Sequence, residues 1–100
     1  MTQIAFILLC HKDPDAVIAQ ARRLIATGDC VAIHYDRNAD AGDFARITDA
    51  LKDEPRVAIV TQRLRCGWGQ WSLVAATLRA VDLALTAFPE ATHAYMLSGD

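Results

Sequence analysis

The sequence lacks the features of several large classes of protein. No apolar run approaches the roughly 20 residues that a membrane-spanning helix needs. Neither sign of charge is in excess, since ten Lys and Arg stand against twelve Asp and Glu, and the net charge is -2. No block of like charges forms a tail of the kind that binds nucleic acid. We therefore expect a protein with no membrane-spanning segment and no nucleic-acid partner. With 53% hydrophobic and 22% charged residues, a disordered chain is excluded as well.

Cysteine is scarce and is spaced for neither metal nor redox chemistry. Cys10, Cys30 and Cys66 make an odd count, and their separations match no zinc or CxxC pattern. Cys10 ends one predicted strand and Cys30 begins the next, so a parallel sheet would separate them by roughly 20 Å. That distance is beyond the reach of a disulfide. We expect buried free thiols and no metal site.

The familiar phosphate-binding loops are also missing. No GxxxxGK[ST] motif occurs, and His11, Lys12 and Asp13 stand where a dinucleotide fingerprint would need glycines. The Gly67–Gly69 segment is a weak substitute, because its central residue is the bulky Trp68. No basic residue precedes the first apolar run, and charged residues follow it, which is unlike a signal peptide. We expect a cytoplasmic protein.

Strand and helix patterns alternate along the chain. Apolar runs predict strands, and apolar residues at helical spacing predict helices that begin at Asp13-Pro14 and near Asp40 and that end near Gly28, Pro55 and Pro89. The order β-α-β-α-β-α-β predicts the α/β class, with a parallel Rossmann-like sheet covered on both faces. The predicted strands are Ile4–Cys10, Val31–Asp36, Arg56–Val60 and Ala94–Leu97, the last running into Ser98.

The last predicted helix carries a stripe of large apolar residues that we expect to face the core. Its spacing fits one side of an α-helix. The stripe consists of Trp71, Val74, Ala75, Leu78, Val81, Leu85 and Phe88.

Residues able to bind a ligand follow the carboxyl ends of the predicted strands, where open parallel sheets hold their ligands. Cys10 and His11 follow the first strand, and Ser98–Asp100 follow the last. Asp36, at the end of the second strand, is placed to accept hydrogen bonds from a ribose or a base edge. The alternative is an ordinary role in a turn or a helix cap, which is the commoner role of aspartate at such positions.

Two further pairs, in the loop after the third strand and at the start of the helix that follows it, allow two interpretations each. Arg63 and Arg65 could reach a diphosphate, because guanidinium groups suit phosphate oxygens, or they could be solvated loop charges. Trp68 and Trp71 could wall a sugar or base pocket, or they could fasten the loop to the core. His34 is expected to pack within its strand, and His93 to lie at the surface.

The order of these segments resembles the core-2/I-branching β-1,6-N-acetylglucosaminyltransferase family, which includes the peptide O-xylosyltransferases. The resemblance covers nearly all 100 residues. Its most specific parts are the Trp-Gly-x-Trp-Ser segment, from Trp68 to Ser72, and Ser98-Gly99-Asp100. The His34-Tyr35-Asp36 segment and His11–Pro14 complete the pattern.

The resemblance implies a GT-A-like fold of which residues 1–100 are the N-terminal donor-binding part, without the acceptor-binding and catalytic part. It implies inverting transfer of N-acetylglucosamine from UDP-GlcNAc, or of a sugar from another UDP-sugar, to a hydroxyl of a glycan or other acceptor. Cys10 and His11 would line the uridine pocket and Asp36 would contact the uridine. Trp68, Trp71 and Ser72 would shape the donor pocket, and Ser98, Gly99 and Asp100 would begin the loop beneath the diphosphate.

The same resemblance implies that no residue of this chain is the catalytic base. The family works without a metal or cofactor, and its base and diphosphate-binding cations lie beyond the position that matches Asp100, so residues 1–100 alone are expected to be inactive. Family members elsewhere are membrane-anchored, whereas this composition is typical of a bacterial cytoplasmic protein. The chain departs from the family at Tyr35, which should leave the site intact, and at Gln70 and Ala75, which leave the sugar preference open. The alternative is a noncatalytic Rossmann-like module whose Trp68–Trp71 loop contacts a protein.

Overall fold

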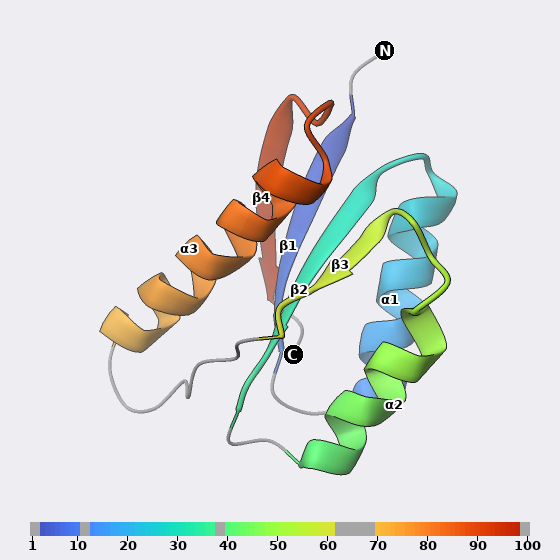
Figure 1. The fold of residues 1–100 in the computed structure, drawn as a ribbon, viewed down its shortest axis with the longest axis vertical. Coiled ribbons are helices and arrows are strands. Elements are labelled where there is room, and N and C mark those ends of the chain that lie inside the picture. The colour runs from blue at the N-terminus through green and yellow to red at the C-terminus, as the bar shows by residue number, and fades with distance from the viewer. Residues whose placement is uncertain (1–2, 11–12, 38–39, 62–69, 99–100) are drawn as a thin grey trace.

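A computed structural model describes residues 3–10, 13–37, 40–61 and 70–98 and, for residues 70–73 and 98, the backbone alone. The chain alternates strand and helix as predicted, which confirms the α/β class (Figure 1). Strand bounds differ from the predicted ones by about one residue, so that Asp36 lies just after its strand. The elements are β1 Ile4–Cys10, α1 Pro14–Ala26, β2 Cys30–Tyr35, α2 Ala41–Leu51, β3 Val57–Ile59, α3 Gln70–Ala87 and β4 His93–Ser98.

The strands form one parallel sheet of order β3-β2-β1-β4. The chain moves from β1 outward to β2 and β3 and then crosses back to place β4 on the other side of β1. Because the first two connections lead to one side of β1 and the third returns to its other side, the order has a switch point beside β1. This is the place where a Rossmann-like sheet is expected to open a crevice.

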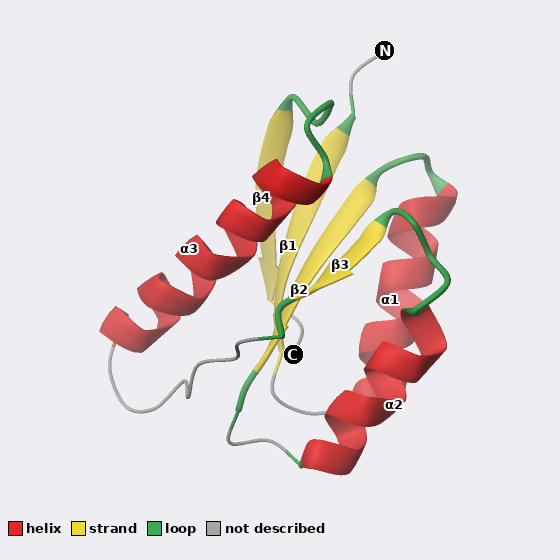
Figure 2. Cartoon of the chain, in the orientation of Figure 1, coloured by secondary structure: helices red, strands yellow, loops and turns green. Residues whose placement is uncertain are grey.

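Helices cover both faces of the sheet, as predicted. Residues that alternate along a strand point to opposite faces, and they separate here into two cores. Leu8 and Ile33 belong to the core beneath α1 and α2, whereas Ile7 and Ala32 belong to the core beneath α3. Figure 2 shows α1 and α2 on one side of the strands and α3 on the other.

Two aspartates cap the N-termini of α1 and α2, the helices that cover one face of the sheet. Asp13 caps α1 by accepting a hydrogen bond from the Ala16 N–H at 3.3 Å, and Pro14 is the first helical residue, as predicted. Asp40 caps α2 by accepting from the Gly42 N–H at 2.6 Å. α1 ends at Ala26 and is followed two residues later by Gly28, whose φ of 94° is a left-handed conformation that glycine adopts readily. α2 ends at Leu51, before the predicted stop at Pro55.

The predicted core stripe of α3 is only partly correct. Phe88 is buried and Val81 packs against the core beneath α3, as predicted. Val74, Leu78 and Leu85 are exposed, by 45%, 58% and 65% respectively. The buried ridge of the helix consists instead of Ala76, Ala80 and Ala84, continued by Phe88 just after the helix. Small side chains allow the backbone of α3 to lie close to the sheet. The distance between helix and sheet, rather than the hydrophobicity of the side chains, therefore determines which side of α3 is buried.

The histidines and cysteines of the described strands lie where the sequence predicts them. His34 is buried in its strand and His93 is exposed, as predicted. Cys10 and Cys30 are buried free thiols. Cys30 pairs with Ala5, five residues before Cys10, so the two cysteines lie about 17 Å apart and no disulfide can join them. Cys66 lies outside the described residues.

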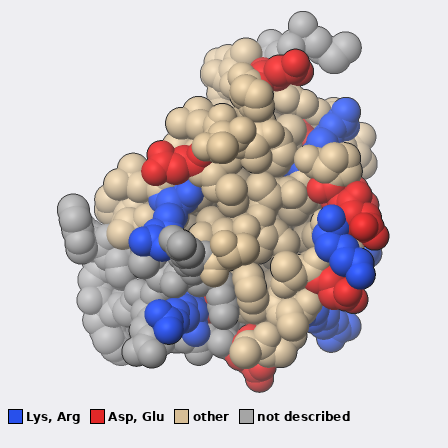
Figure 3. Space-filling model, viewed as in Figure 1, with Lys and Arg blue, Asp and Glu red and all other residues tan. Residues whose placement is uncertain are grey.

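Charged side chains are unevenly distributed over the surface. Charged side chains of both signs crowd the side formed by α1 and α2, whereas residues of other types cover the middle of the visible face (Figure 3). One ion pair joins the two helices, with 2.7 Å between Arg46 Nη2 and Asp15 Oδ1. In the described part of the chain, no helix combines the length and apolar character that crossing a bilayer requires.

Candidate functional site

The carboxyl ends of β1, β2 and β4 meet at one edge of the sheet. Cys10 is paired in register with Tyr35, and Leu9 with Ser98. The Asp36 N–H donates to the Cys10 carbonyl oxygen at 2.8 Å, which continues the ladder one residue past β2. The structure therefore brings Cys10, Asp36 and the Ser98 backbone together beside the switch point.

Asp36 is the charged residue that the structure places most firmly at this edge. It is 7% exposed, although it lies outside the strand. Its backbone is held by the bond to Cys10, so its position follows that of the central strand. A carboxylate is costly to bury unless it has partners, and Asp36 is not without an interaction in the structure.

Cys10 contributes to the edge mainly through its backbone. Its side chain is 4% exposed and belongs to the core beneath α1 and α2, together with Leu8 and Tyr35. A thiol packed in this core is poorly placed to touch a ligand directly. Its carbonyl oxygen, by contrast, fixes the position of Asp36.

Tyr35 is a polar residue whose importance sequence analysis missed. Its side chain is fully buried on the α1 and α2 face, and its hydroxyl has no hydrogen-bond partner among the described residues. Burial raises the pKa of Tyr35, and the nearby carboxylates of Asp43, Asp13 and Asp40, with the Cys10 thiol, raise it further. A β-prone tyrosine between His34 and Asp36 gave no signal that its hydroxyl would be enclosed.

The structure describes only part of the predicted donor site. His11, Trp68, Gly99 and Asp100 lie outside the described residues, as do Arg63 and Arg65. Trp71 and Ser72 lie in the first turn of α3, and Ser98 ends β4; for these three the backbone alone is described. The predicted roles of these side chains stay predictions.

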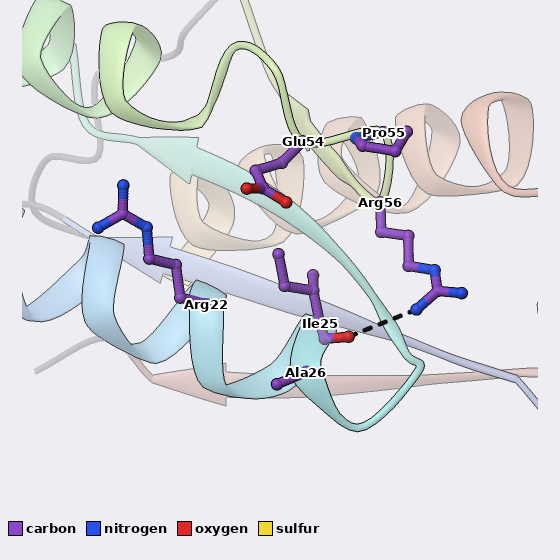
Figure 4. Close-up of a pocket in the computed structure, with 6 residues that line it drawn as sticks. All are labelled: Arg22, Ile25, Ala26, Glu54, Pro55 and Arg56. Atoms are coloured by element: carbon purple, nitrogen blue, oxygen red, sulfur yellow. Dashed lines mark hydrogen bonds between the residues drawn. The ribbon is translucent and has the colours of Figure 1, made fainter.

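A separate cavity opens at the opposite edge of the sheet, near the amino ends of the strands. It measures about 520 Å³ and lies between the end of α1 and the turn that leads into β3. Arg56 Nη1 donates to the Ile25 carbonyl oxygen and Arg22 Nη2 to the Ala50 carbonyl oxygen, both at 3.4 Å. Figure 4 shows the first of these bonds and the Glu54 carboxylate above Ile25. These arginines link α1 to α2 and the following turn, far from Asp36.

The comparisons with known proteins leave the family of the chain open. A scan against protein-family models and a search of curated proteins found no match. The function is therefore inferred from the residues and their geometry.

Proposed function

We propose that this chain is the donor-binding part of an inverting glycosyltransferase that transfers N-acetylglucosamine from UDP-GlcNAc to a sugar hydroxyl. The observation that carries the proposal is the position of Asp36, which is buried at the carboxyl edge and bonded through its N–H to the end of β1. The order of motifs that resembles the core-2/I-branching family supports it. The switch point beside β1 is where an open α/β sheet binds a nucleotide.

The chemistry of uridine fits this position. Uracil presents an imide N–H and ribose presents hydroxyl groups, and a carboxylate accepts hydrogen bonds from both. Because the Asp36 backbone is held at 2.8 Å from the central strand, its carboxylate needs little ordering when a nucleotide arrives. Asp36 would therefore bind and orient the donor.

The transfer itself would be a single in-line displacement. A carboxylate removes the proton of the acceptor hydroxyl, and the acceptor oxygen bonds to the anomeric carbon while the bond to UDP breaks on the opposite face, which inverts that carbon. We assign that base, and the cations that neutralise the departing diphosphate, to residues beyond position 100. The part played by residues 1–100 is to hold the nucleotide.

The proposal is tested by titrating the chain with UDP and UDP-GlcNAc, with AMP as the control nucleotide, while following amide NMR shifts. We expect selective and saturable binding of the two uridine nucleotides. Asp36→Asn and Asp36→Ala should each weaken it by about 10- to 100-fold, the usual effect of losing a hydrogen bond to a charged group.

The matched control is Asp53→Ala, which removes an exposed aspartate from the turn before β3. This variant should bind like the parent chain. Equal uridine affinity in the Asp36 variants and the parent would refute the assignment of Asp36. Equal affinity for AMP and UDP would refute the choice of uridine.

The second candidate function is a noncatalytic interaction module. The exposed apolar side chains of Leu78, Leu85 and Met96, on the α3 side of the sheet, favour it, because exposed apolar side chains that gather on one side commonly mark a protein contact. A module of this kind would show well-dispersed amide signals that ignore both nucleotides. The same titration therefore separates the two functions.

A further inference from the structure

The cavity at the amino edge of the sheet holds charged groups that the proposed function does not use. Its volume of about 520 Å³ lies within the range of small-molecule sites. Arg22 reaches it from α1, and Glu54 and Arg56 reach it from the turn before β3. The apolar part of its wall consists of Ile25, Ala26 and Pro55. The cavity is therefore formed by two short segments of the chain, both of which the structure describes.

Glu54 brings an unpaired carboxylate into this cavity. Its side chain is half-buried, and in the described part of the chain no hydrogen bond or ion pair engages its oxygens. Figure 4 shows this carboxylate above the Ile25 side chain, with Arg22 on one side of it and Arg56 on the other. A carboxylate that is partly removed from water is stabilised when another group donates a hydrogen bond to it. The cavity therefore contains an acceptor that a ligand could satisfy.

The two guanidinium groups are held in place, yet most of their N–H groups have no partner among the described residues. Arg56 donates one hydrogen bond to the Ile25 carbonyl oxygen near the end of α1, and Arg22 donates one to the Ala50 carbonyl oxygen near the end of α2. Helix C-termini carry partial negative charge, so these contacts also offset part of the positive charge of the arginines. The remaining N–H groups are oriented by the same contacts, because a guanidinium group is a rigid plane.

We infer that this cavity binds a neutral saccharide. The Glu54 carboxylate disfavours an anion between the two arginines, and the arginines disfavour a cation. A wholly apolar ligand would take water from three charged groups and give them no partner in return. Sugar hydroxyl groups both donate and accept hydrogen bonds, so one ring can donate to the carboxylate and accept from a guanidinium group. The C–H groups of the ring would lie against Ile25 and Pro55.

The size and lining of the cavity set the expected ligand and its affinity. The volume would hold about one or two sugar rings. None of the lining residues is aromatic, so the ring has no flat surface on which to stack. We therefore expect weak binding, with a dissociation constant of about 1 mM. The inference does not rest on the proposed function, because this cavity and Asp36 lie at opposite edges of the sheet.

The test is an amide NMR titration of the chain with two neutral disaccharides, cellobiose and N,N′-diacetylchitobiose, up to about 50 mM. We expect saturable shifts at the end of α1 and in the turn before β3. Glu54→Ala and Arg22→Ala should each weaken binding by about tenfold, because each removes hydrogen bonds to a charged group. Glu54→Gln keeps an acceptor oxygen and should lose less. Asp53→Ala, which changes the exposed neighbour of Glu54, should bind like the parent chain.

Inorganic phosphate and glycerol are the control ligands, and neither should match the affinity of the disaccharides. Equal or tighter binding of phosphate at the same residues would overturn the choice of a neutral ligand, and equal binding of glycerol would overturn the choice of a saccharide. Disaccharide shifts that do not saturate, that lie away from the cavity, or that Glu54→Ala and Arg22→Ala leave unchanged would overturn the inference itself. Both variants should bind UDP like the parent chain, so failure of this cavity and failure of the uridine site are told apart.

Discussion

Replacing Tyr35 by phenylalanine should stabilise the fold. The tyrosine is fully buried, and its hydroxyl has no partner among the described residues. A buried polar group without a hydrogen bond costs about 1 to 3 kcal/mol. Removing one oxygen leaves a void of only about 10 Å³, worth about 0.2 kcal/mol at the usual cost of a cavity. We expect Tyr35→Phe to raise the free energy of unfolding by about 1 kcal/mol and the melting temperature by about 4 °C.

The pH dependence provides a second measure of the same hydroxyl. Burial raises the pKa of Tyr35 above its ordinary value of 10.0, so the unfolded chain ionises this group first as the pH rises. The parent protein therefore loses stability from about pH 10 upward, until the folded state ionises as well. Tyr35→Phe lacks this group, so its advantage should grow by up to about 1.4 kcal/mol per pH unit in that range.

The assay is urea unfolding of the two chains, followed by far-UV circular dichroism, near neutral pH and again above the ordinary tyrosine pKa of 10.0. Comparing the chains at each pH cancels the titration of every other group. A phenylalanine variant that is less stable near neutral pH would show that the hydroxyl is well bonded. If the difference between the two free energies of unfolding stays constant as the pH rises, Tyr35 titrates alike in the folded and unfolded chains.

Two further predictions concern a helix end and a thiol. Asp13→Ala removes the N-cap of α1 and leaves alanine at a left-handed φ of 57°, so urea unfolding should show a loss of about 2 kcal/mol. Asp40→Ala, at a φ of -57°, loses only a cap and should cost about 1 kcal/mol; equal losses would contradict a role for backbone strain. Burial raises the pKa of the Cys30 thiol and Asp29 raises it further, although Arg56 acts against them. Cys30 should therefore resist alkylation until the chain unfolds, and mass mapping of rapid labelling in the native state would contradict this.

Local patterns were enough to predict the order of elements because each pattern has a direct local cause. The continuous apolar run of Ile4–Cys10 matches β1 residue for residue, as expected of a strand buried on both faces. Asp13-Pro14 marked the start of α1 because the cap and the ring both act within one turn. Asp36 was assigned to the carboxyl edge for a similar reason, since strand polarity alone determines which end it occupies.

Helix α3 shows where local patterns fail. Its sequence offers two apolar sides, one with Val74, Leu78 and Leu85 and one with alanines, and hydrophobicity favoured the larger residues. The structure buries the alanine side because a helix must lie close to β1 and β2 to cover them. Which side faces the sheet depends on the distance between layers, and that distance is absent from any local pattern.

Local patterns were sufficient to predict the class of the fold, the polarity of the strands and the edge at which Asp36 lies, because each depends on residues adjacent in the chain. The strand order, with β4 returning to the far side of β1, follows from the packing of the whole chain. So does the enclosure of the Tyr35 hydroxyl. These features depend on which distant segments become neighbours, and that outcome is set by how the whole chain packs.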